Sequence, residues 1–238
     1  MKFSIVIPVY NEERRIPKSI DAICDFFAKQ SVDTEVIFVN DGSTDKTLDV
    51  LQPYQKKGNI RVVSYEHNRG KGYAVRQGVA AATGDWIVFF DIDLATPLKE
   101  FDHLRSIMEK DDQVIIGSRR LAESHIQKYE SSVRTMLGQG FTLLSNMLVP
   151  GIKDFTCGFK CFSRPAAQKI FPVARIDRWG FDTELLFIAH KKHIPIKQMG
   201  VEWAHDDDSR VHVLKSIITS AKELLEIELN YIRRKYRG

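Results

Sequence analysis

The stretch Trp86-Ile87-Val88-Phe89-Phe90-Asp91-Ile92-Asp93 decides how the rest of the chain is interpreted. Its first five residues are apolar and rich in aromatic side chains, which is typical of a strand buried on both faces of a sheet. Two carboxylates follow the end of this strand. Carboxylates at such a place are costly unless something cationic compensates them, so the pattern indicates a nearby cation.

Further apolar runs alternate with amphipathic stretches through the first half of the chain. Besides residues 86–90, we expect strands over residues 3–9, 35–39, 61–65 and 114–116. We expect helices between them, over residues 16–27, 46–54, 72–82 and 101–108. This alternation predicts a single α/β domain with a Rossmann-like, mostly parallel sheet flanked by helices.

The second half is less regular. Helical patterns cover residues 131–149 and 182–192, and the segment 154–162 is expected to return a strand. A long amphipathic helix is predicted over 211–236, and it ends in the basic run Arg233-Arg234-Lys235-Tyr236-Arg237. We therefore divide the chain into a catalytic domain, residues 1–210, and a C-terminal amphipathic helix with a basic end, residues 211–238.

Composition is that of an ordinary globular protein. The chain has 238 residues, of which 43% are hydrophobic and 28% charged, and its formal net charge is +4. Its three cysteines form no disulfide framework, which favours a reducing compartment. No segment resembles a signal peptide or reaches the roughly 18 apolar residues of a membrane span. We expect a protein that is soluble or only peripherally bound to a membrane.

Polar groups follow the strands of the predicted sheet. They are found at residues 10–12, 40–43, 91–93 and 117–119. Because ligands of such sheets bind beyond the carboxyl ends of the strands, these groups predict one shared site. Asp91 and Asp93 offer hard oxygen ligands that suit Mg²⁺ or Mn²⁺, with phosphate oxygens in other positions. The alternative is a pair of solvated turn aspartates.

Three further elements fit an anionic ligand. Asp41 could accept hydrogen bonds from a nucleobase or ribose. The turn Asn68-Arg69-Gly70-Lys71-Gly72 precedes a helix, so Arg69 or Lys71 would meet a diphosphate there. This turn matches neither the GxGxxG nor the Walker A sequence. The alternative is a plain tight turn between a strand and a helix. Arg119, Arg134 and Arg210 could form a phosphate clamp, although isolated arginines are more often surface residues.

Taken together, these motifs resemble a known family. The segments Ile7-Pro8-Val9-Tyr10-Asn11-Glu12, Asn40-Asp41-Gly42-Ser43-Thr44-Asp45, Asn68-Arg69-Gly70-Lys71-Gly72 and Asp91-Ile92-Asp93 occur in order and at the expected gaps. They resemble the family 2 inverting glycosyltransferases, which have the GT-A fold.

The second half narrows this resemblance. Its motifs, Gly117-Ser118-Arg119, Cys157-Gly158-Phe159-Lys160, Arg178-Trp179-Gly180-Phe181-Asp182 and Ser209-Arg210, look like those of the dolichyl-phosphate β-glucosyltransferases. The dolichyl- and polyprenyl-phosphate mannosyltransferases are slightly less similar. The mannosyl branch often has a third metal ligand, a Gln, where this chain has Ala95. An acidic run, Asp206-Asp207-Asp208, is a further departure, and many relatives carry transmembrane helices.

The resemblance implies an enzyme that transfers a hexose from a nucleotide-sugar to a dolichyl or polyprenyl phosphate. UDP-glucose is the favoured donor, and GDP-mannose is the second. By this resemblance the nucleotide-sugar site consists of Pro8, Tyr10, Asn11, Glu12, Asp41, Arg69, Lys71 and Asp91. Asp91 and Asp93 would hold Mg²⁺ or Mn²⁺, and Arg119, Arg134 and Arg210 would bind the acceptor phosphate. Asp182 would orient the acceptor or the donor sugar, or it caps the helix 182–192.

A lipid acceptor requires access to a membrane. The resemblance places the protein in the cytoplasm, peripheral at the cytosolic face of a membrane. For the helix 131–149 we favour membrane contact, and for the C-terminal helix we favour core packing, with cations that complement its carboxyl end. The residues that suggest an apolar side on 131–149 are Met136, Leu137, Phe141, Leu144 and Leu148.

Two other functions compete with this interpretation. One is a family 2 glycosyltransferase that acts on a soluble or cell-envelope glycan, which would need a general base rather than an arginine clamp. The other is a non-catalytic nucleotide-binding protein on the same fold, which the intact Asp91 and Asp93 disfavour. Nucleic-acid binding is not expected, because the basic residues are dispersed and do not alternate with aromatic ones.

Overall fold

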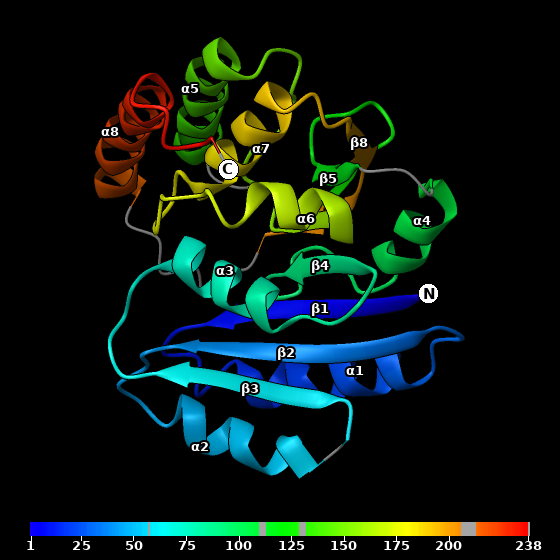
Figure 1. Cartoon of the computed structure of the whole chain (residues 1–238). Helices are drawn as coiled ribbons and strands as arrows, with labels where there is room; N and C mark the ends of the chain where they lie inside the picture. Colours follow the sequence, from blue (N-terminus) through cyan, green and yellow to red (C-terminus); the bar gives the residue numbers. More distant parts are fainter. Residues whose placement is uncertain (57, 110–112, 129–131, 206–212, 238) are drawn as a thin grey trace.

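The fold is built on one central sheet (Figure 1). The computed structural model describes residues 1–56, 58–109, 113–128, 132–205 and 213–237. The sheet has seven strands in the order β3-β2-β1-β4-β7-β5-β8. These strands are β1 (Lys2–Val9), β2 (Asp33–Asp41), β3 (Ile60–Tyr65), β4 (Trp86–Phe90), β5 (Val114–Ser118), β7 (Phe159–Ser163) and β8 (Ile196–Gly200).

Most of the strand pairs are parallel, as the sequence predicts. β1 pairs in parallel with β2 and with β4, β2 with β3, and β5 with β8. The exception is β7, which is antiparallel to both of its neighbours, β4 and β5. The expected returning strand in 154–162 is therefore confirmed, and it lies in the middle of the sheet. A separate small sheet pairs β6 (His125–Lys128) with β9 (Glu202–Ala204).

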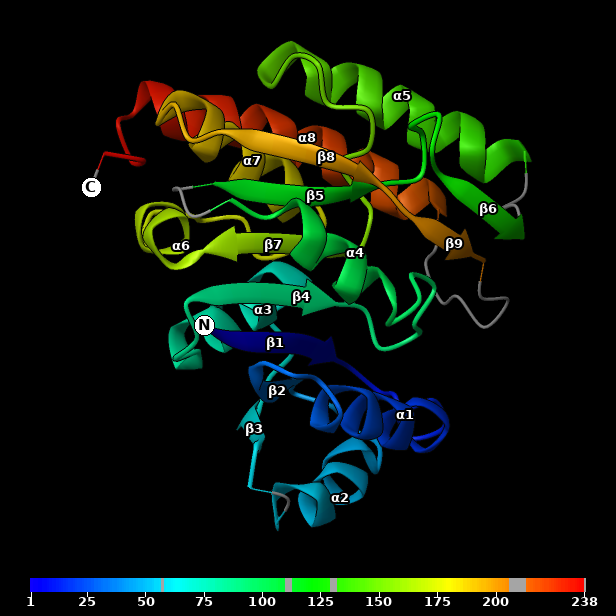
Figure 2. The same ribbon diagram turned by 90° about the vertical axis from the view of Figure 1, so that its right-hand side faces the viewer.

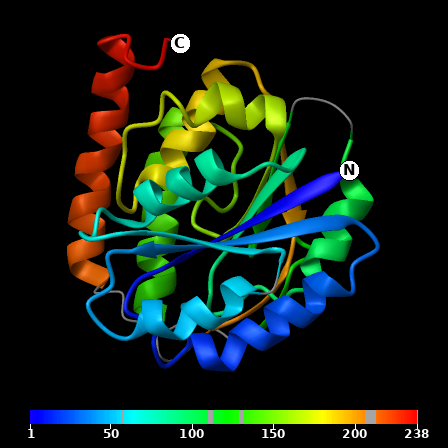
Figure 3. The same ribbon diagram turned by 60° about the horizontal axis from the view of Figure 1, so that its bottom comes forward.

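Helices cover both faces of the sheet (Figure 3). The helices of the first half are α1 (Ile16–Ala28), α2 (Thr47–Leu51), α3 (Lys71–Ala81) and α4 (Glu100–Ile107), and those of the second half are α5 (Ser132–Leu148), α6 (Arg164–Ile170), α7 (Phe181–Lys191) and α8 (Val213–Ile232). Side chains of α1, α2 and α4 pack on one face, and those of α3, α6 and α7 pack on the other.

The inner strands are apolar throughout because both of their faces are buried. In β1, Phe3, Ile5 and Ile7 face the α1 side, while Val6 faces the α3 side. Phe101 of α4 packs edge-on against Phe3, with the ring centroids 5.0 Å apart. The continuous apolar runs that predicted buried strands therefore correspond to a sheet between two helical layers.

Some elements differ from the sequence-based prediction. The expected helix 46–54 is a short α2 followed by a 3₁₀ helix, η1 (Gln52–Lys56). The sequence analysis did not separate α6, β6, β8 or β9. A signal for α6 was available, because Ser163 caps its first turn by accepting a hydrogen bond from the amide of Ala166, and a proline stands among its first residues.

The C-terminal helix packs on the rest of the molecule. Figure 2 shows α8 beside α5, and Leu224 and Ile227 are buried in the same apolar cluster as Leu186 of α7. Core packing is therefore confirmed for Leu224 of the predicted apolar side, whereas Leu225, Leu229 and Ile232 are exposed. The proposed boundary near residue 210 lies outside the described residues. Within those residues, no helix combines the length and the apolar character that crossing a bilayer requires.

A buried carboxylate ties the sheet to the turn before β4. Glu35 of β2 accepts hydrogen bonds from the Ser4 hydroxyl at 2.6 Å and from the amide and hydroxyl of Thr83 at 2.6 and 2.7 Å. Burial alone would raise the pKa of Glu35, but these hydrogen bonds outweigh burial and hold the pKa below its usual value. The ionised form therefore stabilises the fold.

This arrangement predicts a pH-dependent contribution to stability. Because the folded-state pKa is depressed, the contribution is present above the unfolded-state pKa of about 4.3 and is lost as the pH falls through the folded-state pKa. We expect Glu35→Gln to lower the free energy of unfolding at pH 7 by about 1–2 kcal/mol, and the difference from wild type to shrink in acid. Urea unfolding at several pH values measures this. Glu66→Gln, at an exposed position, is the control, and a pH-independent difference would contradict the prediction.

Candidate functional site

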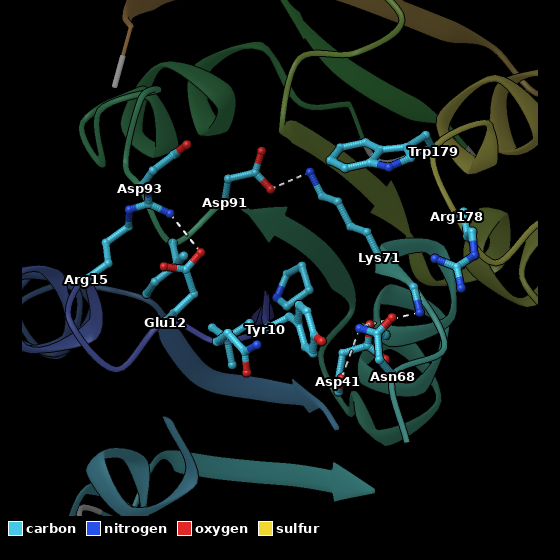
Figure 4. Close-up of a pocket in the computed structure, with 16 residues that line it drawn as sticks. Tyr10, Glu12, Arg15, Asp41, Asn68, Lys71, Asp91, Asp93, Arg178 and Trp179 are labelled. Carbon is cyan, nitrogen blue, oxygen red and sulfur yellow. Dashed lines mark hydrogen bonds and ion pairs between the residues drawn. The ribbon is translucent and has the colours of Figure 1, made fainter. Parts of the chain in front are cut away.

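A group of polar side chains lines a cavity at the carboxyl ends of β1, β2 and β4 (Figure 4). The cavity has a volume of about 520 Å³, within the range of sites that enclose small-molecule ligands. Its lining includes Pro8, Tyr10, Asn11, Glu12, Arg15, Asp41, Asn68, Lys71, Asp91, Asp93, Arg178 and Trp179. The predicted convergence is therefore confirmed for the polar groups that follow β1, β2 and β4, whereas residues 117–119, at the end of β5, do not line the cavity.

The turn after β1 forms one wall. Asn11 has a φ of +55°, a conformation that asparagine tolerates better than most residues. Its amide donates to the Ser43 hydroxyl at 3.0 Å, and its side-chain oxygen accepts from the Thr44 amide at 2.8 Å. These bonds join the loops after β1 and β2. Tyr10 remains 43% exposed, so its ring is available to a ligand in the cavity.

Asp41 lies at the end of β2 and is almost completely buried. One of its oxygens accepts from the Tyr65 hydroxyl and the Arg69 amide, at 2.8 Å each. The other accepts from the Asn68 side chain at 2.7 Å and the Gly70 amide at 2.9 Å. The carboxylate thus holds the loop that leads into α3. Direct binding of a base or ribose by Asp41 stays a prediction.

The two cations of this loop point in different directions. The Lys71 ammonium lies 2.6 Å from an Asp91 carboxylate oxygen, inside the cavity. The Arg69 guanidinium instead stacks on the Tyr73 ring, 4.3 Å from its centroid, and is not among the cavity-lining groups. Of the two residues expected at a diphosphate, the structure brings Lys71 into the site and leaves Arg69 outside it.

The aspartates that follow β4 form a strongly charged pair. Burial, and then repulsion by Asp91, raise the pKa of Asp93. Burial would lower the pKa of Lys71, but the carboxylates of Asp91 and Asp182 outweigh it and raise that pKa. The carboxylates thus keep the ammonium charged, and Lys71 is a cation that partly compensates them.

These two aspartates fit a hard divalent cation. Among the described residues, no group of three or more His, Cys, Asp or Glu side chains is arranged around a metal position. Asp91 and Asp93 alone would therefore supply two protein ligands, and a diphosphate ligand would supply others. This is the pattern by which Mg²⁺ is often held, with one or two carboxylates plus phosphate oxygens.

Asp91 also packs closely against the loop before β7. A Cβ atom on Gly158 would lie 1.8 Å from one Asp91 carboxylate oxygen, far inside van der Waals contact. Only a glycine at position 158 leaves the Asp91 side chain in its observed place. The first and second halves of the chain thus meet at this carboxylate.

Asp182 lies in the first turn of α7, and its carboxylate is 2.6 Å from the ammonium of Lys160. The helix begins at Phe181 with Gly180 at its N-cap, so the capping alternative for Asp182 is wrong. Lys160 comes from β7, is completely buried and also donates to the Cys157 carbonyl at 2.7 Å. Burial raises the pKa of Asp182, while Lys160 and Lys71 oppose this rise.

Of the three predicted clamp arginines, Arg119 alone has a described side chain. Arg119 forms a bidentate pair with the buried Asp154, at 2.7 and 2.9 Å, and donates to the Thr156 hydroxyl at 2.7 Å. It does not line the cavity. Arg134 belongs to α5, but its side chain lies outside the described part of the chain, as does the whole of Arg210.

Several known proteins have sequences similar to that of this chain. Residues 4–171 match the model of glycosyl transferase family 2. The chain belongs to glycosyl transferase family 2. It is 36% identical to a dolichyl-phosphate β-glucosyltransferase of Dictyostelium discoideum, over 96% of this chain and 74% of that protein. A human protein of the same name is 37% identical, over 99% of this chain and 78% of that protein.

Solved structures support the GT-A fold of this glycosyltransferase. One is glucosyl-3-phosphoglycerate synthase of Mycobacterium tuberculosis in complex with Mn²⁺, UDP-glucose and phosphoglyceric acid. Its TM-score is 0.65 at 22% identity, and the match covers 96% of this chain and 79% of that chain. The predicted fold class is therefore confirmed.

Several side chains of the glycosyltransferase cavity were given no role by sequence analysis. Arg15, which pairs with Glu12 at 2.8 Å, lies one helical turn beyond the recognised motif. Asn68 stands within a recognised turn and holds Asp41. Arg178 and Trp179 stand in a quoted motif that follows no strand, so only the tertiary structure places them at the cavity.

The close approach of Gly158 to Asp91 predicts a specific loss in this glycosyltransferase. We expect Gly158→Ala to displace the Asp91 carboxylate and to weaken Mn²⁺ binding by about 10- to 100-fold, the usual effect of disturbing the support of a metal ligand. Electron paramagnetic resonance measures free Mn²⁺ in a titration. Gly58→Ala is the matched control, because a Cβ there meets nothing within 4 Å. Unchanged Mn²⁺ affinity of a folded Gly158→Ala protein would contradict the prediction.

Proposed function

We propose that this glycosyltransferase transfers glucose from UDP-glucose to a dolichyl or other polyprenyl phosphate. The observation that carries the proposal is the joint presence of Asp91, Asp93 and Lys71 in one cavity, in a chain that is 33–38% identical over nearly its whole length to proteins named dolichyl-phosphate β-glucosyltransferase. GDP-mannose is the second candidate donor. Ala95 speaks against it, since the mannosyl branch often has a metal-binding Gln at that position.

The cavity gives the donor a place for each of its parts. The nucleoside would lie along Pro8–Glu12 and the loop that Asp41 holds. The diphosphate would lie between Lys71 and the two aspartates. Mn²⁺ or Mg²⁺ held by Asp91 and Asp93 would act as a Lewis acid that neutralises charge on the leaving diphosphate. Support for a divalent metal comes from the similar solved structure that contains Mn²⁺ and UDP-glucose.

The acceptor needs little activation. A phosphate monoester has a second pKa near 6, so its oxygen is largely deprotonated at neutral pH. That oxygen attacks the anomeric carbon, and the bond from this carbon to the diphosphate breaks. UDP leaves with the electron pair of that bond, and the configuration at the anomeric carbon is inverted. The protein must hold an anion beside an anionic donor, which is the role we propose for Arg119, Arg134 and Arg210. Arg119 is held in one orientation by Asp154.

Asp182 remains a proposed orienting residue for one of the sugars. Asp182 does not line the cavity, and the proposal is supported by its ion pair with Lys160 and by its electrostatic effect on the cavity-lining Lys71. Asp182 does not have to act as a general base, because the acceptor phosphate is already largely deprotonated at neutral pH. Asp182 and Lys160 would instead fix the electrostatic field at the inner end of the site.

Helix α5 is the surface that we propose for contact with the lipid. Of the apolar stripe predicted on it, Phe141 and Leu148 pack on the core. Met136 and Leu144 are exposed, as are Leu143 and Met147 of the same helix. Four exposed large apolar side chains on one helix fit an interfacial position in which the apolar side enters the headgroup region. A peripheral position at the cytosolic face of a membrane follows from this proposal.

The donor and the metal requirement can be tested together. We expect transfer of labelled glucose from UDP-glucose to a short polyprenyl phosphate, with no transfer from the other UDP- and GDP-sugars of a panel and none with EDTA. Asp93→Ala should lower the rate by about 100- to 1000-fold, since it removes a ligand of the cation that stabilises the leaving group. Asp102→Ala, on the exposed surface of α4, is the matched control and should leave the rate unchanged.

The same assay separates the alternatives. A product formed only from GDP-mannose would replace the donor. Hydrolysis of UDP-glucose without a lipid product would shift the acceptor to a soluble or cell-envelope glycan. Binding of nucleotide with neither transfer nor hydrolysis would favour the non-catalytic protein.

The membrane contact gives a separate prediction. We expect the double substitution Leu143→Asp and Met147→Asp to weaken binding to phosphatidylcholine vesicles that contain polyprenyl phosphate by about tenfold or more, because each change removes apolar surface and adds charge. Co-sedimentation measures this. The charge-matched control is the double substitution Gln52→Asp and Gln55→Asp. Both residues are exposed on η1, at the other end of the molecule from α5 (Figure 1). Equal losses in both double variants would contradict a specific role of α5.

A further inference from the structure

An aromatic side chain without an assigned role faces the charged part of the cavity. Trp179 lines the cavity and is 41% exposed. In Figure 4 its indole extends toward the Lys71 ammonium and the Asp91 carboxylate, on the opposite side of this ion pair from Asp41. A large, partly exposed aromatic ring is thus part of the lining of a cavity that also holds charged groups.

The loop that carries Trp179 is anchored to α3 before the tryptophan. The carbonyl of Asp177 accepts from the Tyr73 amide at 3.1 Å, and the carbonyl of Ile176 accepts from Arg76 at 2.8 Å. The amide of Ile176 in turn donates to Glu184 of α7 at 2.8 Å. The loop therefore has a fixed position next to the helix that begins with Lys71.

The loop is anchored to the C-terminal helix after the tryptophan. The amide of Gly180 donates to the carboxylate of Glu223 at 2.7 Å, and both groups are buried. A Cβ atom on Gly180 would lie 2.8 Å from the Glu223 Cβ, so the two chains touch at this point. With anchors on both sides, the Trp179 indole is presented to the cavity in a preorganised position.

The combination of an aromatic face with charged groups fits a hexose. A hexose ring offers axial C–H groups on its faces, which pack on an aromatic ring, and equatorial hydroxyls around its edge, which need hydrogen-bond partners. Polar side chains of the lining that are assigned to neither the metal nor the diphosphate, such as Arg178, offer such partners. A nucleobase could also stack on an indole, and a comparison of UDP with UDP-glucose separates the two ligands.

We propose that the Trp179 indole forms the apolar wall of the donor-hexose subsite, and that Glu223 of the C-terminal helix positions it. The proposal rests on the proposed function, because it takes the sugar of UDP-glucose as the ligand. It assigns the C-terminal helix a part in sugar binding, through the backbone of the Trp179 loop.

The test compares the binding of UDP with that of UDP-glucose, because only the second ligand carries the hexose. Calorimetry with Mn²⁺ present and no acceptor measures both affinities. We expect Trp179→Ala to weaken UDP-glucose by about tenfold, the scale of one aromatic contact, and to leave UDP within about twofold of wild type. Trp179→Phe, which keeps an aromatic face, should restore most of the loss. Leu225→Ala, at an exposed apolar position of α8 outside the cavity, should change neither affinity.

The role of Glu223 is tested in the same way. Glu223→Ala should weaken UDP-glucose without weakening UDP, whereas Glu223→Gln, which keeps an oxygen that accepts from Gly180, should behave nearly as wild type. Glu226→Ala, at an exposed position one turn further along α8, is the matched control. A merely structural role of Glu223 would lower the melting temperature and both affinities together, and this result would overturn its positioning role.

The remaining outcomes are decisive for the tryptophan. If Trp179→Ala weakens UDP and UDP-glucose equally, the indole contacts the nucleotide, and the hexose wall is refuted. If it changes neither affinity but raises the KM for polyprenyl phosphate, the indole belongs to the acceptor, and the hexose wall is again refuted. If the wild-type protein binds UDP but not UDP-glucose, the donor assignment itself fails, and the sugar wall fails with it.

Discussion

The cavity depends on how two aspartates are held at the end of a buried strand. Asp91 and Asp93 repel each other, and burial makes this repulsion expensive. Lys71 relieves part of it through its ion pair with Asp91. The lysine arrives there because Asp41 fixes the preceding loop with four hydrogen bonds to its carboxylate. The charge balance of the site is thus built from three neighbouring strand ends, and it leaves a demand for a further cation.

The second half of the chain completes this electrostatic arrangement. Lys160, completely buried in β7, needs a counter-charge, and Asp182 of α7 provides it. Because β7 runs antiparallel between β4 and β5, its first residues and the preceding loop stand next to the aspartates that follow β4. Gly158 touches Asp91 for this reason. The sheet order therefore brings two acid–lysine pairs close enough to interact electrostatically, Lys71 with Asp91 and Lys160 with Asp182.

The helices of the second half connect this site to the surface. Glu223 and Tyr236 reach from the C-terminal segment to the loop around Gly180 and to Glu184 of α7. The same segment leaves Leu225, Leu229 and Ile232 exposed beside α5, which exposes four large apolar side chains of its own. The proposed lipid-contacting surface and the loop that lines the cavity are thus parts of one packed unit.

Much of this molecule follows from local sequence. The run 86–93 and its counterparts predict buried parallel strands whose carboxyl ends carry acids and cations, because strand burial requires apolar residues and ligand binding requires polar ones at the ends. The metal-type aspartates, the Pro8–Glu12 wall and Lys71 were found in this way. The resemblance of ordered motifs identifies the family without the tertiary structure.

Other features depend on contacts between residues far apart in the chain. Arg69 was expected at a diphosphate by position, but its guanidinium stacks on Tyr73 outside the cavity, and Asp154 sets the orientation of the Arg119 guanidinium. Trp179 follows no strand, and its place at the cavity depends on Gly180 meeting a helix 43 residues away. The sequence by itself determined the strands, the acidic strand end and the family. The tertiary structure alone decided which side chains face the cavity, because side-chain direction is set by partners that local patterns do not specify.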